Sequence, residues 1–178
     1  MLGGRIYQIT ADGEAHEVSE KLHTPFAVVT FFEPTFSTTF DEAMAYETFL
    51  KRLESLLPSP NLFYAIRITG RFGHVKARSV PKQHNYRPLD EAASEQHVFG
   101  FDDVEGCLAG FFTPAFMASL NVPGLHLHFL TSDRRRGGHV VAHHGVEASR
   151  CRVEGQSRGD RKLGRHVARR LHGQPRLG

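Results

Sequence analysis

The chain has 178 residues, of which 40% are hydrophobic, 10% aromatic and 23% charged, with a formal net charge of +3. This length supports one domain with its own core, and the apolar runs are too short to cross a bilayer. The first residues lack the apolar region of a signal peptide, and two cysteines make no disulfide framework. We therefore expect a cytoplasmic protein, and exclude a membrane protein and a disulfide-rich scaffold.

Charge and aromatic residues divide the chain near residue 140. Residues 1–140 carry 13 Lys or Arg against 16 Asp or Glu, whereas residues 141–178 carry 9 against 3. All 14 Phe and all 4 Tyr lie in the first part. Because a basic segment without aromatic rings buries little surface, we predict an ordered domain over 1–143 and a disordered tail, rich in Arg, Gly and His, over 144–178.

Three interpretations of this tail stay open. It can serve as a nucleic-acid arm, but it lacks aromatic side chains on which bases stack, so nucleic acid is not an expected partner. It can be a plain solvated extension. It can also follow a change of reading frame near Val141, a hypothesis motivated by the abrupt loss of aromatic residues. A genomic sequence that continues through this region without a shift relative to close relatives would exclude the third.

Strand-like segments and one helix are predicted in the first half. Residues 5–10 alternate as a strand and end in the turn ADGE, and residues 26–32 have the composition of a strand buried on both faces. Thr39 and Glu42 fit a capping box before an apolar stripe, and Pro58 ends the helix. The stripe consists of Tyr46, Phe49, Leu50, Leu53, Leu56 and Leu57.

The second half is predicted to be mostly strand. Residues 62–69 and 71–79 flank Gly70 and are expected to form a hairpin. Further strands are expected at 98–101, 104–112, 125–131 and 137–143, with a loop or short helix over 82–96, one or two helical turns over 114–120 and a turn at 121–124. The fold class is therefore α+β: a single domain dominated by antiparallel or mixed β-sheet, with one main helix.

A group of histidines lies in the sequence LHLHFLTSDRRRGGHV, residues 125–140. Side chains of a strand alternate between its faces, so the apolar residues around His126 and His128 enter the core. The two imidazoles then lie side by side on the other face, with Cα atoms roughly 6–7 Å apart. If the hairpin loop is centred between Asp133 and Arg134, His139 lies opposite His128.

Three neutral imidazoles in one small volume, with an open position, suit catalytic Zn²⁺ or another borderline divalent ion. The competing interpretation is an ordinary polar outer face, because short histidine motifs are common by chance. His143 and His144 are poorer candidates, because adjacent residues point to opposite faces of a strand. The remaining histidines have no comparable spacing, and they include His74, His84 and His97.

Three ordered motifs resemble the α-acetolactate decarboxylase family: residues 24–34, 56–83 and 121–140, read as TPFAVVTFFEP, LLPSPNLFYAIRITGRFGHVKARSVPKQ and NVPGLHLHFLTSDRRRGGHV. The resemblance covers about residues 3–140. It implies that His126, His128 and His139 bind a catalytic zinc and that Arg78 is an active-site residue. The implied reaction converts (S)-2-acetolactate to (R)-acetoin and CO₂, in acetoin and 2,3-butanediol formation, and the family commonly forms homodimers.

Two departures from the family pattern define the main alternative. Family members carry a further segment before the start of this chain, with a glutamate at the zinc site, and a C-terminal segment with another active-site glutamate. Glu147 and Glu154 lie in the tail, whose sequence does not match, so neither is assigned that role. The alternative is a truncated remnant that binds metal without catalysis.

Two further classes are weaker candidates. A cupin-like metal oxygenase also uses H-x-H on a strand, but usually adds a glutamate a few residues later, where this chain has Phe129 to Ser132. An RNA- or DNA-binding protein would use the tail and Arg134 to Arg136, and its binding would depend steeply on salt. These three arginines fit a solvated hairpin tip.

Overall fold

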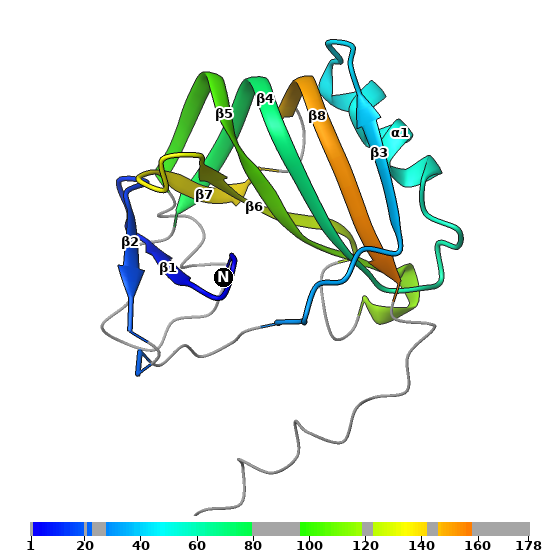
Figure 1. The fold of residues 1–178 in the computed structure, drawn as a ribbon, viewed down its shortest axis with the longest axis horizontal. Helices are drawn as coiled ribbons and strands as arrows, with labels where there is room; N and C mark the ends of the chain where they lie inside the picture. Colours follow the sequence, from blue (N-terminus) through cyan, green and yellow to red (C-terminus); the bar gives the residue numbers. More distant parts are fainter. Residues whose placement is uncertain are drawn as a thin grey trace, which may run out of the picture.

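The computed structural model describes residues 2–19, 21–22, 28–79, 97–118, 123–141 and 146–157. Figure 1 shows a curved sheet with a helix on one side and a small two-stranded ribbon at one end. The strands are β1 Ile6–Ile9, β2 Ala15–Val18, β3 Phe36–Phe40, β4 Tyr64–Ser79, β5 His97–Thr113, β6 Gly124–Thr131, β7 Gly137–Val140 and β8 Val146–Ser157. The helices are α1, Tyr46–Ser55, and a short 3₁₀ helix η1, Ala115–Met117.

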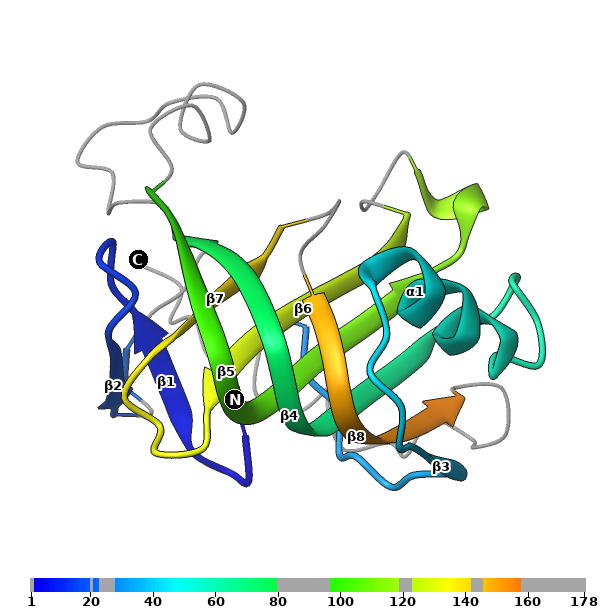
Figure 2. The same cartoon turned by 90° about the horizontal axis from the view of Figure 1, so that it is seen from above.

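The large sheet closes on itself along part of its length. Its strand order is β3-β8-β4-β5-β6-β7, and β7 pairs in turn with the end of β4, at Ala77 and Arg78. All these pairings are antiparallel within the described residues, which confirms the α+β fold class. The β1–β2 ribbon attaches to the β6–β7 hairpin through a bridge between Glu14 and Arg136. Figure 2 shows from above how the large sheet curves round on itself.

A single bent strand replaces the hairpin predicted around Gly70. β4 runs unbroken from Tyr64 to Ser79 and pairs with β5 over nearly its whole length, with Gly70 opposite Gly106. A Cβ atom at Gly70 would lie 2.1 Å from the Arg150 carbonyl oxygen, and one at Gly106 would lie 2.4 Å from the Phe129 ring. The two glycines therefore permit close strand contact where β4 and β5 curve, rather than a turn.

The prediction of a disordered tail from residue 144 is wrong for residues 146–157. These residues form β8, which lies between β3 and β4 in the sheet. Its inward side chains are small but almost completely buried, and they are Val146, Ala148, Cys151 and Val153. β8 was missed because these residues carry little apolar surface and alternate with charged ones. Residues 158–178 lie outside the described residues.

Helix α1 covers the inner face of the sheet beside β8 (Figures 1 and 2). Phe49 and Leu53 from the predicted stripe are 2% and 0% exposed, which confirms the helix and its buried face. The predicted capping box is wrong, because Thr39 lies in β3 and the helix begins after Ala45 without a side-chain cap. No helix in the described part of the chain is both long and apolar enough to cross a membrane.

Residues 28–34 do not form the buried strand predicted over 26–32. They run as irregular chain, with Phe31 92% exposed. This stretch lies on the outer face of the sheet, where the Glu33 backbone N–H donates to Gln156 and the Arg67 guanidinium packs over the Phe32 ring. Residues 26–27 lie outside the described residues. So do the predicted loop at 82–96 and the first two residues of the turn predicted at 121–124.

Candidate metal centre

Strand β6 places two histidines on the outer face of the sheet. Leu127 and Phe129 are 7% and 2% exposed and point into the core. His126 and His128 alternate with them and therefore point the other way, as the sequence predicts. Core packing of the apolar neighbours thus fixes the face on which both imidazoles lie.

The β6–β7 hairpin brings the third histidine to the same place. His128 lies directly opposite His139, which confirms the predicted register. The tight loop that sets this register is held by the Thr131 hydroxyl, which donates to Asp133 at 2.6 Å, and by the backbone N–H of Arg135, which donates to the same carboxylate at 3.0 Å. These bonds lower the pKa of Asp133, the Thr131 bond most.

The three imidazoles converge closely. Their ring centroids are 5.3 Å apart for His126 and His128, 4.5 Å for His126 and His139, and 5.0 Å for His128 and His139. One ring nitrogen from each residue can be chosen so that all three lie within 4.8 Å of one another. The His126 and His128 Nε2 atoms are 3.3 Å apart. Two nitrogens bound to one tetrahedral ion at about 2.0–2.1 Å would lie at about this separation.

The electrostatic environment keeps these rings neutral near pH 7. Burial lowers the pKa of His139 to about 3, helped by His128, His126 and Arg78. The His128 side chain keeps an exposed edge, yet loss of solvent within the cluster and the positive charge of a protonated His126 lower its pKa to about 4. Burial, followed by the charge of Arg78, also lowers the pKa of His126. Neutral imidazoles have the free lone pairs that a metal ion requires.

The donor set therefore fits a divalent ion. Three imidazole nitrogens match the protein ligands of a catalytic zinc site, which keeps its fourth position for water or substrate. Among the described residues, these histidines are the cluster whose donor atoms meet in this way.

A single row of facing residues crosses the outer face and contains the candidate site. Neighbours in the row lie directly opposite each other on adjacent strands, so their side chains share one face. In order, the row is Arg78 of β4, His139 of β7, His128 of β6, Ala109 of β5, Arg67 of β4 and Glu154 of β8. Because the sheet closes on itself, β4 supplies a residue near each end of the row.

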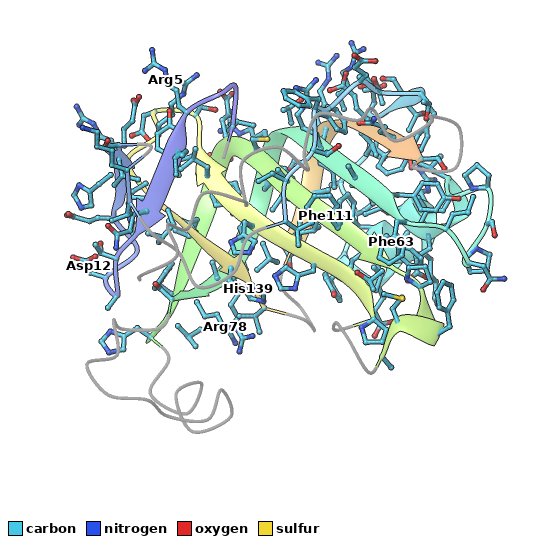
Figure 3. The ribbon with its side chains drawn as sticks, turned by 90° about the horizontal axis from the view of Figure 1, so that it is seen from below. Arg5, Asp12, Phe63, Arg78, Phe111 and His139 are labelled. Carbon is cyan, nitrogen blue, oxygen red and sulfur yellow. The ribbon has the colours of Figure 1, made fainter. Side chains whose placement is uncertain are left out.

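The row brings the predicted Arg78 beside the histidines. Arg78 is half-buried and lies opposite His139, and its positive charge contributes to the low pKa of both His126 and His139. In Figure 3, Arg78 and Phe111 lie on opposite sides of His139. The structure thus places all four predicted site residues together.

Sequence reasoning missed the far end of the row. Arg67 donates from Nε and Nη2 to one oxygen of Glu154, at 2.9 and 2.7 Å. Glu154 is 8% exposed although it lies in the segment predicted to be disordered. An alternating pattern of small apolar residues around Glu154 was the signal available in the sequence. Glu147, another acid in that segment, lies opposite His74, on the far side of Gly70 in β4.

This fold and donor set define a β-sheet protein with three histidines that could hold a metal ion, and comparison with known proteins assigns its family. The family profile for α-acetolactate decarboxylase matches residues 1–164. The chain is 47% identical over 141 residues to the α-acetolactate decarboxylases of Brevibacillus brevis and Methanosarcina mazei. The chain belongs to the α-acetolactate decarboxylase family.

The solved structures agree in fold. The crystal structure of acetolactate decarboxylase from Bacillus subtilis subspecies spizizenii matches with a TM-score of 0.81 at 40% identity, over 87% of this chain and 66% of that one. The Brevibacillus brevis alignment covers 79% of this chain and 50% of the relative. The chain therefore spans about half the length of the relatives that it matches.

Proposed function

We propose that this protein decarboxylates (S)-2-acetolactate to (R)-acetoin at a zinc ion held by His126, His128 and His139. The observation that carries the proposal is the convergence of three neutral imidazoles beside Arg78 in a member of this family. The relatives that match are α-acetolactate decarboxylases, which supports a small 2-hydroxy-3-keto acid as the substrate.

The reaction breaks the bond between the carboxylate carbon and the carbon that bears the hydroxyl group. The electron pair moves to the neighbouring ketone oxygen, CO₂ leaves, and a proton then adds to the carbon that lost it. When bound, Zn²⁺ supplies a Lewis acid that stabilises negative charge on the ketone oxygen. The three histidines hold that ion by lone pairs that are available at neutral pH, because their pKa values are lowered.

Arg78 is proposed to hold the substrate carboxylate. A guanidinium presents paired N–H donors that match the two carboxylate oxygens. Equal binding of substrate and transition state would not accelerate the reaction, so the contribution of Arg78 is to orient the breaking bond. Its place next to His139 in the row puts this donor beside the candidate metal site.

The second candidate is a metal-binding remnant without catalysis. It is kept as a candidate because the activity in the relatives' names belongs to proteins of which this chain matches about half the length. Purified protein assayed with racemic acetolactate, with and without added Zn²⁺, separates the two. Acetoin formed by the zinc-loaded protein, and lost in His128→Ala, supports the enzyme. Zinc uptake without acetoin supports the remnant. Lys76→Ala, an exposed change on β4, is the matched control.

The cytoplasm and a homodimer stay predictions for this chain. The first is supported by Cys107 and Cys151, which are both free thiols. Burial raises the pKa of each to about 11, so neither is a reactive thiolate at neutral pH.

A further inference from the structure

The row that contains the histidines has one small side chain, and it lies next to the candidate metal site. Ala109 of β5 faces His128 on one side and Arg67 on the other. Leu108 is fully buried in the core, so Ala109 points to the outer face together with the histidines. The backbones at His128 and Arg67 are separated by two interstrand spacings, about 9–10 Å. Between them the outer face of the sheet carries only the Ala109 methyl group, which we call the floor.

Larger side chains border this floor. Phe111, two residues along β5, lies opposite His126 and is half-buried. The wall on the far side is Arg67, whose guanidinium is fixed by Glu154 at 2.7 Å and by packing over the Phe32 ring at 4.8 Å. The small Ala109 side chain therefore lies between the imidazoles and the Arg67 side chain, whose position is fixed.

The direction of a bound ligand follows from the order of the row. Arg78 lies on one side of the histidines and Ala109 lies on the other. A ligand whose oxygens bind the ion and whose carboxylate reaches Arg78 would extend its remaining carbons away from Arg78 and over Ala109, which faces His128 on the other side. Phe111 also lies on the side of His139 away from Arg78 (Figure 3). Apolar contact with a methyl group and an aromatic ring suits an alkyl substituent.

We propose that Ala109 is the floor of a subsite for the alkyl substituent on the hydroxyl-bearing carbon, and that its small size sets the largest substituent accepted. This inference rests on the proposed function, since it assumes a 2-hydroxy-3-keto acid oriented by Arg78. Ala109 is a specificity residue in this account. It holds no proton and binds no metal.

The test measures binding rather than turnover. The probes are 2,3-dihydroxy-2-methylbutanoate and its homologues with ethyl or propyl on carbon 2. They keep the carboxylate and two vicinal oxygens, but have no ketone to accept the electron pair, so they do not decarboxylate. Protein loaded with Co²⁺ reports binding of each probe through its visible absorption spectrum. The variants are Ala109→Leu and Ala109→Gly, and Ala115→Leu, at an exposed alanine of η1, is the matched control.

We expect the unsubstituted protein to bind the ethyl probe up to about fourfold more tightly than the methyl probe, as one added buried methylene predicts. In Ala109→Leu this order reverses, with the ethyl probe at least tenfold weaker than the methyl probe. In Ala109→Gly the propyl probe gains at least threefold relative to the methyl probe, and this variant introduces no steric clash. Ala115→Leu keeps the original order.

An unchanged order of affinities in the leucine variant that still takes up Co²⁺ would overturn the inference. If the leucine variant does not take up Co²⁺, the inference is overturned equally by a glycine variant in which the propyl probe gains nothing relative to the methyl probe. Failure of the unsubstituted protein to bind any probe also overturns it. Size-dependent binding without acetoin formation from acetolactate would reject the proposed activity and leave the alkyl subsite standing.

Discussion

The row of facing residues contains two sets of ionisable side chains, the Arg67–Glu154 pair and the three histidines, and they differ in how they are partnered. Arg67 and Glu154 satisfy each other through two hydrogen bonds, and Phe32 covers the guanidinium. Towards the other end, the ring nitrogens of three imidazoles with lowered pKa values lie together in one small volume. Polar groups that complete each other hold a sheet together, whereas neutral imidazoles whose nitrogens converge can bind an ion. The predictions below test this difference.

Removal of one imidazole should have the largest effect. His139→Ala takes away a ligand that the hairpin register alone brings into place, so we expect zinc affinity to fall by more than about 100-fold. Measurement of zinc bound per protein after dialysis against a series of buffered zinc concentrations checks this. Unchanged zinc affinity would exclude the three-histidine centre.

Substitution of Arg78 should lower activity while zinc stays bound. Arg78→Lys keeps the charge but loses the paired donors, so we expect kcat/KM for acetolactate to drop roughly 10- to 100-fold. Zinc content, measured on the same preparation, should equal that of the unsubstituted protein. A variant with full activity would show that Arg78 has no role in orienting the substrate.

Disruption of the Arg67–Glu154 ion pair should lower the stability of the fold and leave zinc affinity unchanged. Glu154→Gln leaves the Arg67 guanidinium without its carboxylate, and we expect the free energy of unfolding to fall by about 1–2 kcal/mol, since Arg67 is partly exposed. Urea unfolding followed by circular dichroism measures the change. Zinc affinity should stay the same, and a large loss of zinc binding would contradict the separation of the two ends.

Acidification should weaken the fold of the zinc-free protein. A histidine whose pKa is lower in the folded state than in the unfolded one stabilises the fold above its unfolded pKa, and that stability is lost as pH falls through the folded pKa. For His128 and His139 the window runs from about 6.5 down to about 4 and about 3. Zinc-free protein should therefore lose stability across this range, with a shallower slope in His128→Gln. Equal slopes by urea unfolding would contradict the lowered pKa of His128.

The histidine centre could be predicted from sequence because its determinants are local. Alternation places His126 and His128 on one face, and a short loop fixes His139 opposite His128. Neither argument requires knowledge of distant strands. The family resemblance added Arg78, whose place beside His139 depends on closure of the sheet between β4 and β7.

The rest of the row depends on pairing between residues far apart in the chain. Gly70 carries the usual signal of a turn, but β5 and β8 on either side hold β4 in one continuous strand. β8 has no aromatic residue, so composition alone predicts disorder, while burial of Val153 and its neighbours comes from partners more than 80 residues away. The Arg67–Glu154 pair could not be foreseen without that strand.

The curvature of β4 has one more consequence. Arg67 and Arg78 border opposite sides of the histidine centre, yet both belong to the same strand and are joined through the bend at Gly70. The separation of Arg67 and Arg78 is thus governed by how sharply one strand curves, and not by the docking of two separate elements. Evolution, or an engineer, could change that separation through residues that line the bend and never touch a ligand.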